Sequence, residues 1–82
     1  MGYNFEDKAW EDYKNAEKRD KKKIDDLLKE IRRGNQVAHA EALKHELSGY
    51  YSVHINEKDR LIYRLEKTTV NILSCKGHYK DK

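Results

Sequence analysis

The hydrophobic period of this chain changes near its middle, and that change limits the folds open to it. Up to about residue 33, apolar residues recur every three or four positions, as on one face of a helix. From about residue 50, apolar and polar residues alternate, as in a strand with one covered face. Helices followed by a run of strands are typical of an α+β fold.

The first part of the chain predicts an edge strand and then two helices. The chain opens with a short alternating stretch that suits the strand, and helical spacing begins at about Glu6. We expect Asp20 to cap the second helix and Gly34 to end it. The apolar stripes of the two helices hold Ala9, Trp10, Tyr13 and Ala16, and then Ile24, Leu27, Leu28 and Ile31. We place Trp10 and Tyr13 in the core first and in a partner groove second.

The second part of the chain predicts strands at residues 50–55, 60–65 and 69–76, separated by polar turns. The last of these is rich in β-branched residues and suits a strand with both faces covered. Residues 40–44 predict another strand or a bent connector. We therefore expect a single domain over residues 1–82, with two N-terminal helices packed on one face of a mainly antiparallel, twisted sheet.

Composition limits the core and the partners of such a domain. With 37% hydrophobic and 40% charged residues among 82, the core must be small, and a partner or assembly often stabilises a domain of this kind. A formal charge of +3 weakly favours an anionic partner. The single cysteine, Cys75, suits a reducing compartment and a small strand position. No apolar run approaches the ~20 residues of a membrane span, so we expect a cytoplasmic protein without a membrane partner.

Strand alternation gathers basic side chains on one face of the predicted sheet. If the helices cover the face of Leu61 and Tyr63, then Arg60 and Arg64 stand on the other face, together with His54. An open face lined with such residues is a usual binding place for a nucleic-acid backbone.

Four residues supply the groups that metal-free RNA cleavage needs. That reaction uses the 2′-hydroxyl of the substrate as nucleophile, with a base, an acid and positive charge on the phosphorane. Glu41 is a candidate base and His78 a candidate acid, while Arg60 offers a bidentate fork to phosphate. Tyr79 could stack on a nucleobase or donate a hydrogen bond. The four histidines lack the spacing of a metal site, so we expect neither a metal nor another cofactor.

Simpler roles stay open for each of these residues. Glu41 alone is typical of a solvated surface acid, and Arg60 could merely pair with Asp59 or Glu41. His78 and Tyr79 could be exposed or packed residues near a chain end.

Five motifs run along the chain: Ala9-Trp-Glu-Asp-Tyr, Glu41-Ala-Leu-Lys-His-Glu-Leu-Ser-Gly, Tyr51-Ser-Val-His-Ile, Asp59-Arg-Leu-Ile-Tyr and Gly77-His-Tyr. Together they resemble the YoeB/Txe toxins of the RelE superfamily, over essentially the whole chain. The Leu-Lys-His-x-Leu-Ser-Gly run and the closing His-Tyr are the most specific parts of this resemblance.

The resemblance implies a RelE-like, microbial RNase-like fold and an endoribonuclease that cuts mRNA in the ribosomal A site, in contact with ribosomal RNA. A YefM-type antitoxin would hold it inactive, and a homodimer stays open. By motif match, Glu41 would be the general base, Arg60 the phosphate stabiliser and His78 the general acid, while Tyr79 would orient the substrate. Further basic residues that could contact RNA, or simply be solvated, are Lys44, His45, His54 and Arg64.

The chain departs from the pattern of that family at three places. These are Val53 and His54 in place of two arginines, Ala40 and Ala42 in place of prolines that flank Glu41, and residues 80–82 after Tyr79. The loss of the arginines motivates a second hypothesis, a weak or inactive module that binds a ribosome or an antitoxin on the same fold. A third is a structural domain that simply pairs with another chain.

Overall fold

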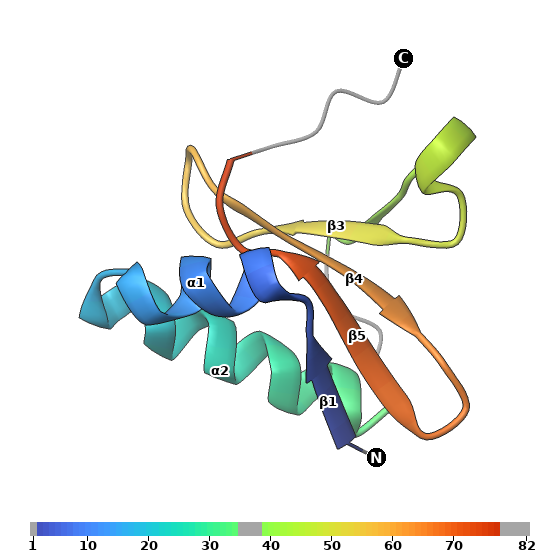
Figure 1. Cartoon of the computed structure of the whole chain (residues 1–82), viewed down its shortest axis with the longest axis horizontal. Helices are drawn as coiled ribbons and strands as arrows, with labels where there is room; N and C mark the ends of the chain where they lie inside the picture. The colour runs from blue at the N-terminus through green and yellow to red at the C-terminus, as the bar shows by residue number, and fades with distance from the viewer. Residues whose placement is uncertain (1, 35–38, 78–82) are drawn as a thin grey trace.

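The computed structural model describes residues 2–34 and 39–77, and in them two helices pack against one sheet (Figure 1). In chain order the elements are β1 (Gly2–Phe5), α1 (Asp7–Asn15), α2 (Lys18–Arg32), β2 (Glu41–Ala42), a 3₁₀ turn (His45–Leu47), β3 (Tyr51–His54), β4 (Arg60–Leu65) and β5 (Thr69–Ser74). The predicted α+β class, with its helices before most of its strands, is confirmed.

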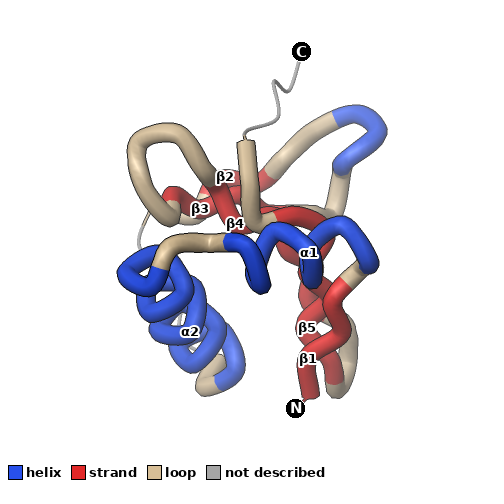
Figure 2. Tube along the Cα trace, turned by 60° about the vertical axis from the view of Figure 1, so that its left-hand side comes forward, coloured by secondary structure: helices blue, strands red, loops and turns tan. Residues whose placement is uncertain are grey.

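Within the described residues, the strands form one five-stranded sheet in the order β1-β5-β4-β3-β2. Strand β1 runs parallel to β5, and the other neighbours are antiparallel, so the sheet is mainly antiparallel as predicted. Figure 2 shows β1 beside β5, although the two strands come from opposite ends of the chain. Strand β2 settles the choice left open for residues 40–44, because two of them pair with β3 and the others connect.

The link between the helices contains only two extended residues, and this link sets where α2 begins. Ala16 and Glu17 have ψ angles of 151° and 156°, so the chain passes almost directly from one helix into the next. Helix α2 starts straight after Glu17, and the predicted cap at Asp20 is wrong. Asp20 lies in the first turn instead, where a carboxylate is favourable beside the positive end of the helix dipole. Gly34 follows the helix as predicted, with a φ of +82° and its N–H 3.0 Å from the carbonyl oxygen of Ile31.

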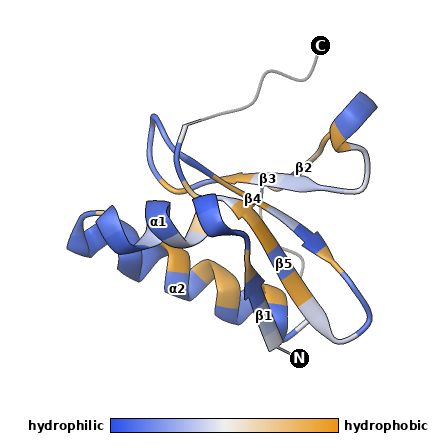
Figure 3. Ribbon diagram, in the orientation of Figure 1, coloured by the Kyte–Doolittle hydropathy of each residue, from blue (hydrophilic) through white to orange (hydrophobic). Residues whose placement is uncertain are grey.

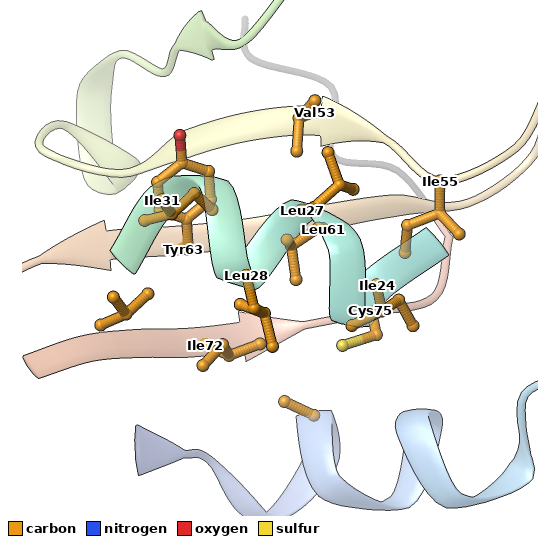
Figure 4. Close-up of a cluster of buried hydrophobic side chains, with 12 residues drawn as sticks. Ile24, Leu27, Leu28, Ile31, Val53, Ile55, Leu61, Tyr63, Ile72 and Cys75 are labelled. Atoms are coloured by element: carbon orange, nitrogen blue, oxygen red, sulfur yellow. The ribbon is translucent and has the colours of Figure 1, made fainter. Parts of the chain in front are cut away.

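A small apolar core fills the space between the helices and the sheet. Figure 3 shows the apolar side of α2 and the apolar length of β5, and Figure 4 shows the side chains of α2 lying against those of β4 and β5. The stripe predicted for α2 is therefore buried as expected. The buried cluster holds Ala9, Ile24, Leu27, Leu28, Ile31, Val53, Ile55, Leu61, Tyr63, Val70, Ile72 and Cys75.

Trp10 lies outside this core, so its predicted core placement is wrong. Helix α1 buries Ala9, and the neighbouring Trp10 is left 47% exposed. Its ring stacks on that of Tyr13 with centroids 5.8 Å apart, and it meets Phe5 edge-on at 5.6 Å. Tyr13 is half-buried against the core, in line with its prediction. Together with Tyr3, these rings line an open groove of about 430 Å³ beside β1 and both helices.

A bulge in β5 changes which of its side chains face the helices. Tyr63 pairs with Ile72 and Ile62 pairs with Ser74, so one extra residue stands on β5 between the two pairs. Alternation reverses at that residue, and Ser74 faces the same way as Ile62 while Cys75 returns to the core. Strand β5 ends at Ser74, two residues earlier than predicted, and before the bulge its two faces are covered unequally: Val70 and Ile72 are buried toward the helices, whereas Thr69 and Asn71 on the other face are half-buried.

Replacement of a core residue of α2 should destabilise the fold far more than replacement of an exposed apolar residue. Ile24 is fully buried, and we expect Ile24→Ala to lower the free energy of unfolding by roughly 2–5 kcal/mol through lost transfer energy and a cavity. Leu65 is 48% exposed, and Leu65→Ala should change it by about 0.5 kcal/mol or less. Urea denaturation followed by circular dichroism measures both, and equal losses would contradict the helix packing described above.

Candidate functional site

The face of the sheet opposite the helices, here called the open face, carries four of the predicted site residues, Glu41, His54, Arg60 and Arg64, in three cross-strand rows. The first row contains His54 of β3, Arg60 of β4 and Gly77, which follows β5. His54 and Arg60 are directly paired, and the N–H of Arg60 donates to the carbonyl oxygen of Gly77 at 3.0 Å. Directly paired residues have Cβ atoms roughly 5 Å apart, so the side chains of His54 and Arg60 are neighbours.

The second row contains Glu41 of β2, Ser52 of β3, Ile62 of β4 and Ser74 of β5. Each is paired with the next across the sheet. Ser52, Ile62 and Ser74 are buried, whereas the carboxylate-bearing Glu41 is exposed at the sheet edge. The centre of the open face is therefore buried, and its exposed polar and charged side chains lie around that centre.

The third row contains Arg64 of β4, Asn71 of β5 and Asn4 of β1, and hydrogen bonds hold Arg64 in place there. Its guanidinium donates to Glu66 at 2.6 Å and lies 5.2 Å from the ring centroid of Tyr50. The hydrogen bond to Glu66 and the charge of that carboxylate raise the pKa of Arg64. Glu66 also accepts a hydrogen bond from Asn71, which is paired with Asn4 of β1. Arg64 thus faces the predicted way, with its guanidinium bound to Glu66 at the protein surface.

Glu41, His54 and Arg60 come from three successive strands and share one corner of the open face. Strands lie about 4.8 Å apart and residues rise about 3.4 Å along a strand, so Glu41, two strands and two residues away, is separated from Arg60 by roughly 12 Å between backbones, with His54 on the strand between them. In the described part of the chain, the guanidinium of Arg60 makes no ion pair, and the simpler pairing with Asp59 or Glu41 is not observed. The sheet therefore carries a carboxylate, an imidazole and a guanidinium on three successive strands of the same face.

The other predicted site residues lie farther along or outside the described chain. Lys44 and His45 follow β2 beyond the third row, where His45 opens the 3₁₀ turn with a φ of +57°. They extend the basic surface lengthwise instead of standing beside Arg60. His78 and Tyr79 lie outside the described residues, directly after Gly77.

Val53 and His54, which replace the two arginines of the family pattern, lie on opposite faces of the sheet. Val53 is buried and belongs to the helix-facing core, so a side chain at this position has no path to the open face. His54 is exposed and sits in the first row. The departure that bears on the site is therefore the one at His54.

Two carboxylates that the sequence analysis did not select hold the segment before His78. Asp12 of α1 accepts hydrogen bonds from the N–H of Cys75 at 3.1 Å and from the hydroxyl of Ser74 at 3.4 Å. Asp59 accepts the N–H of Gly77 at 2.9 Å. From the sequence, Asp59 is a turn residue, the start of one motif and a possible partner of Arg60, and its spacing from Asn56 is the signal that could have drawn attention to it.

The chain matches the model of the YoeB-like toxin of bacterial type II toxin–antitoxin systems over residues 5–79. The chain belongs to the YoeB toxin family. It is 36% identical to the toxin YoeB of Escherichia coli K12 over 80 residues, which cover 92% of this chain and 95% of that toxin.

Solved structures of YoeB proteins share this fold. The YoeB dimer from Staphylococcus aureus matches with a TM-score of 0.86 and 40% identity, over 96% of this chain and 98% of that one. A heterotetrameric YoeB–YefM toxin–antitoxin complex from the same species matches with a TM-score of 0.84 and 41% identity, over 94% and 95%. The predicted family and the predicted fold class are both confirmed.

Residues 2–34 and 39–77 contain no helix long and apolar enough to cross a bilayer. Over the same residues, no group of three or more histidines, cysteines or acids is placed to hold a metal ion.

The thiol of Cys75 should react only slowly with alkylating reagents in the folded protein. Burial, followed by the charge of Asp12, raises the pKa of its thiol to about 12. At pH 8 only about one thiol in ten thousand is then ionised, and the thiolate is the form that reacts with alkylating reagents. We expect iodoacetamide to label Cys75 slowly in native buffer and fully in 6 M guanidinium, as read by intact-mass spectrometry. Rapid native labelling would contradict the burial of the segment that precedes Gly77.

Proposed function

We propose that this member of the YoeB family is a metal-independent endoribonuclease that cuts mRNA on the ribosome and so inhibits translation. The observation that supports it best is the first row of the open face, where His54 and Arg60 stand beside Gly77, with Glu41 one row away. The family match by itself supports a toxin, and the first row supports phosphodiester cleavage as its activity.

Each group in the proposed mechanism has one task. Glu41 accepts the proton of the substrate 2′-hydroxyl, whose oxygen then attacks the adjacent phosphorus. The guanidinium of Arg60 neutralises the charge that builds on the non-bridging oxygens of the phosphorane. The bond from phosphorus to the 5′-oxygen breaks, and His78 donates the proton that this leaving oxygen needs. The products are a 2′,3′-cyclic phosphate and a 5′-hydroxyl, and Tyr79 orients the nucleotide at the cut.

Dependence on the ribosome fits the small size of the basic surface. Arg64 is already bound to Glu66, which leaves few cations on the open face to hold a free RNA chain. Affinity for a nucleic-acid backbone grows with the number of phosphates neutralised, so free mRNA should bind weakly. We propose that the ribosome supplies the positioning, with Lys44 and His45 in contact with RNA along the same face.

The proposed partners follow from the same surface and from the relatives. We propose a YefM-type antitoxin whose acidic, partly disordered segment folds over the basic open face and blocks the first row. A YoeB–YefM complex has been solved for the relative from Staphylococcus aureus, and a YoeB dimer for the same species. We propose a homodimer as a second assembly, a cytoplasmic location, and one domain over residues 1–82.

A second candidate function rests on His54. With a histidine where the family pattern has an arginine, the first row has one permanent charge fewer. The alternative is therefore a weak or inactive module that binds ribosomes or an antitoxin without cutting RNA. Such a module would bind programmed ribosomes and leave their mRNA intact.

Loss of a site residue should abolish cleavage without unfolding the protein. We expect Glu41→Gln and Arg60→Gln each to slow cleavage of mRNA on programmed ribosomes by about 10²–10³-fold, since a base or a charge that acts in the transition state is removed. Arg19→Gln, the same charge change at an exposed position of α2, is the matched control and should keep full activity. Primer extension maps the cuts, and equal rates for Glu41→Gln, Arg60→Gln and wild type would refute the assigned roles.

Replacement by arginine should raise the cleavage rate at position 54 and not at position 53. His54→Arg places a permanent charge in the first row, and we expect it to raise the cleavage rate severalfold. Val53→Arg forces a charge into the core and should unfold the protein at room temperature. Cleavage assays and thermal melts separate the two effects. A gain of activity from Val53→Arg, or a loss from His54→Arg, would contradict the assignment of faces.

A further inference from the structure

The turn between β3 and β4 holds the carboxylate of Asp59 in a fixed direction. The side-chain oxygen of Asn56 accepts the N–H groups of Lys58 at 2.7 Å and of Asp59 at 2.8 Å. The side-chain amide of Asn56 donates to Oδ2 of Asp59 at 3.1 Å. Oδ1 of Asp59 is thereby left pointing out of the turn toward the last described part of the chain.

Both peptide groups of Gly77 are bound by this corner of the sheet. The N–H of Gly77 donates to Oδ1 of Asp59 at 2.9 Å, and its carbonyl oxygen accepts the N–H of Arg60 at 3.0 Å. Gly77 has a φ of +76°, a conformation that glycine adopts at little cost. Two consecutive residues of β4 and its turn thus clamp the residue that directly precedes His78.

The bond from Gly77 is not needed to close the turn. The carbonyl oxygen of Asp59 already accepts the N–H groups of Ile55 at 2.9 Å and of Asn56 at 3.3 Å. Among the described residues, Gly77 is the partner of Oδ1, and its hydrogen bond lowers the pKa of Asp59 further below neutral pH, where a carboxyl group is already charged. A charged acceptor makes a stronger hydrogen bond than a neutral one.

We propose that Asp59 is a positioning residue for RNA cleavage, which acts on the general acid His78 by fixing Gly77, the residue directly before it in the chain. This inference rests on the proposed function, because it assigns to His78 the role of general acid. Asp59 itself touches neither substrate nor reacting atoms. Displacement of a reacting group by about 1 Å can cost about 10²-fold in rate, so a clamp one residue away is well placed to matter.

The test is a double-mutant cycle between Asp59 and His78, measured as single-turnover cleavage of mRNA on programmed ribosomes. We expect Asp59→Ala to lower the maximal single-turnover rate constant by about 10–100-fold with little change in the half-saturating concentration, because the orientation of the acid is lost and substrate binding is kept. Asp59→Asn keeps an oxygen acceptor and should retain activity within about threefold of wild type. In a His78→Ala background, Asp59→Ala should cause no further loss, since the group that it positions is gone. Glu57→Ala, an exposed acid removed from the same turn, is the matched control and should behave as wild type.

The outcomes separate this proposal from the proposed function. Equal losses from Asp59→Ala with and without His78 would show a general structural role and overturn the inference, as would full activity of Asp59→Ala. Failure of the wild-type protein to cut ribosome-bound mRNA would overturn the proposed function and the role of Asp59 with it. Cleavage by the wild type together with an unaffected Asp59→Ala would overturn the role of Asp59 alone.

Discussion

The register of β4 against its two neighbours is the constraint on which the site depends. One side of β4 sends Leu61 and Tyr63 into the core under α2, and the other side carries Arg60 and Arg64. A slip of one residue would exchange the two sets, burying guanidinium groups and exposing the core. The hydrophobic burial that stabilises the fold therefore also fixes the position of Arg60 opposite His54. Stability and the candidate site are two consequences of one pairing.

The bulge in β5 turns the end of that strand toward the site. If side chains alternated strictly along β5 with no bulge, Ser74 would point into the core after Val70 and Ile72, and Cys75 would lie on the open face. With it, Cys75 fills the core, Ser74 bonds to Asp12, and the chain continues to Gly77 beside Arg60. Carboxylates from α1 and from the β3–β4 turn then hold this segment from two sides. Elements far apart in the sequence thus cooperate to place the residue that precedes His78.

The sequence was sufficient for features that depend on local periodicity. Alternation alone placed Arg60, Arg64 and His54 on the open face, and helical spacing identified the buried stripe of α2. It failed where tertiary packing decides. Nothing local to Trp10 shows that α1 presents Ala9 to the sheet, and no pattern around Leu73 announces a bulge whose partner lies on another strand.

Recognition of the family by its motifs also missed features that depend on tertiary structure. It treated Val53 and His54 as one lost pair of arginines, whereas the pleat of β3 separates them into a core residue and an exposed residue of the open face. It also gave no role to Asp59 and Asp12, although both stand in its motifs, since their hydrogen bonds reach backbone groups far away in sequence. A side chain that hydrogen-bonds to the backbone of a distant residue produces no characteristic spacing in the sequence.

The central claim is that the corner formed by Glu41, His54, Arg60 and Gly77 is where RNA binds and reacts. The most direct test is a nuclear magnetic resonance titration of ¹⁵N-labelled protein with a dinucleotide that lacks the attacking 2′-hydroxyl and cannot be cut. The account predicts that the largest amide shifts fall on these four residues and their strand neighbours. Shifts gathered instead around the aromatic groove of Trp10 and Tyr13, or no shifts at millimolar dinucleotide, would contradict it.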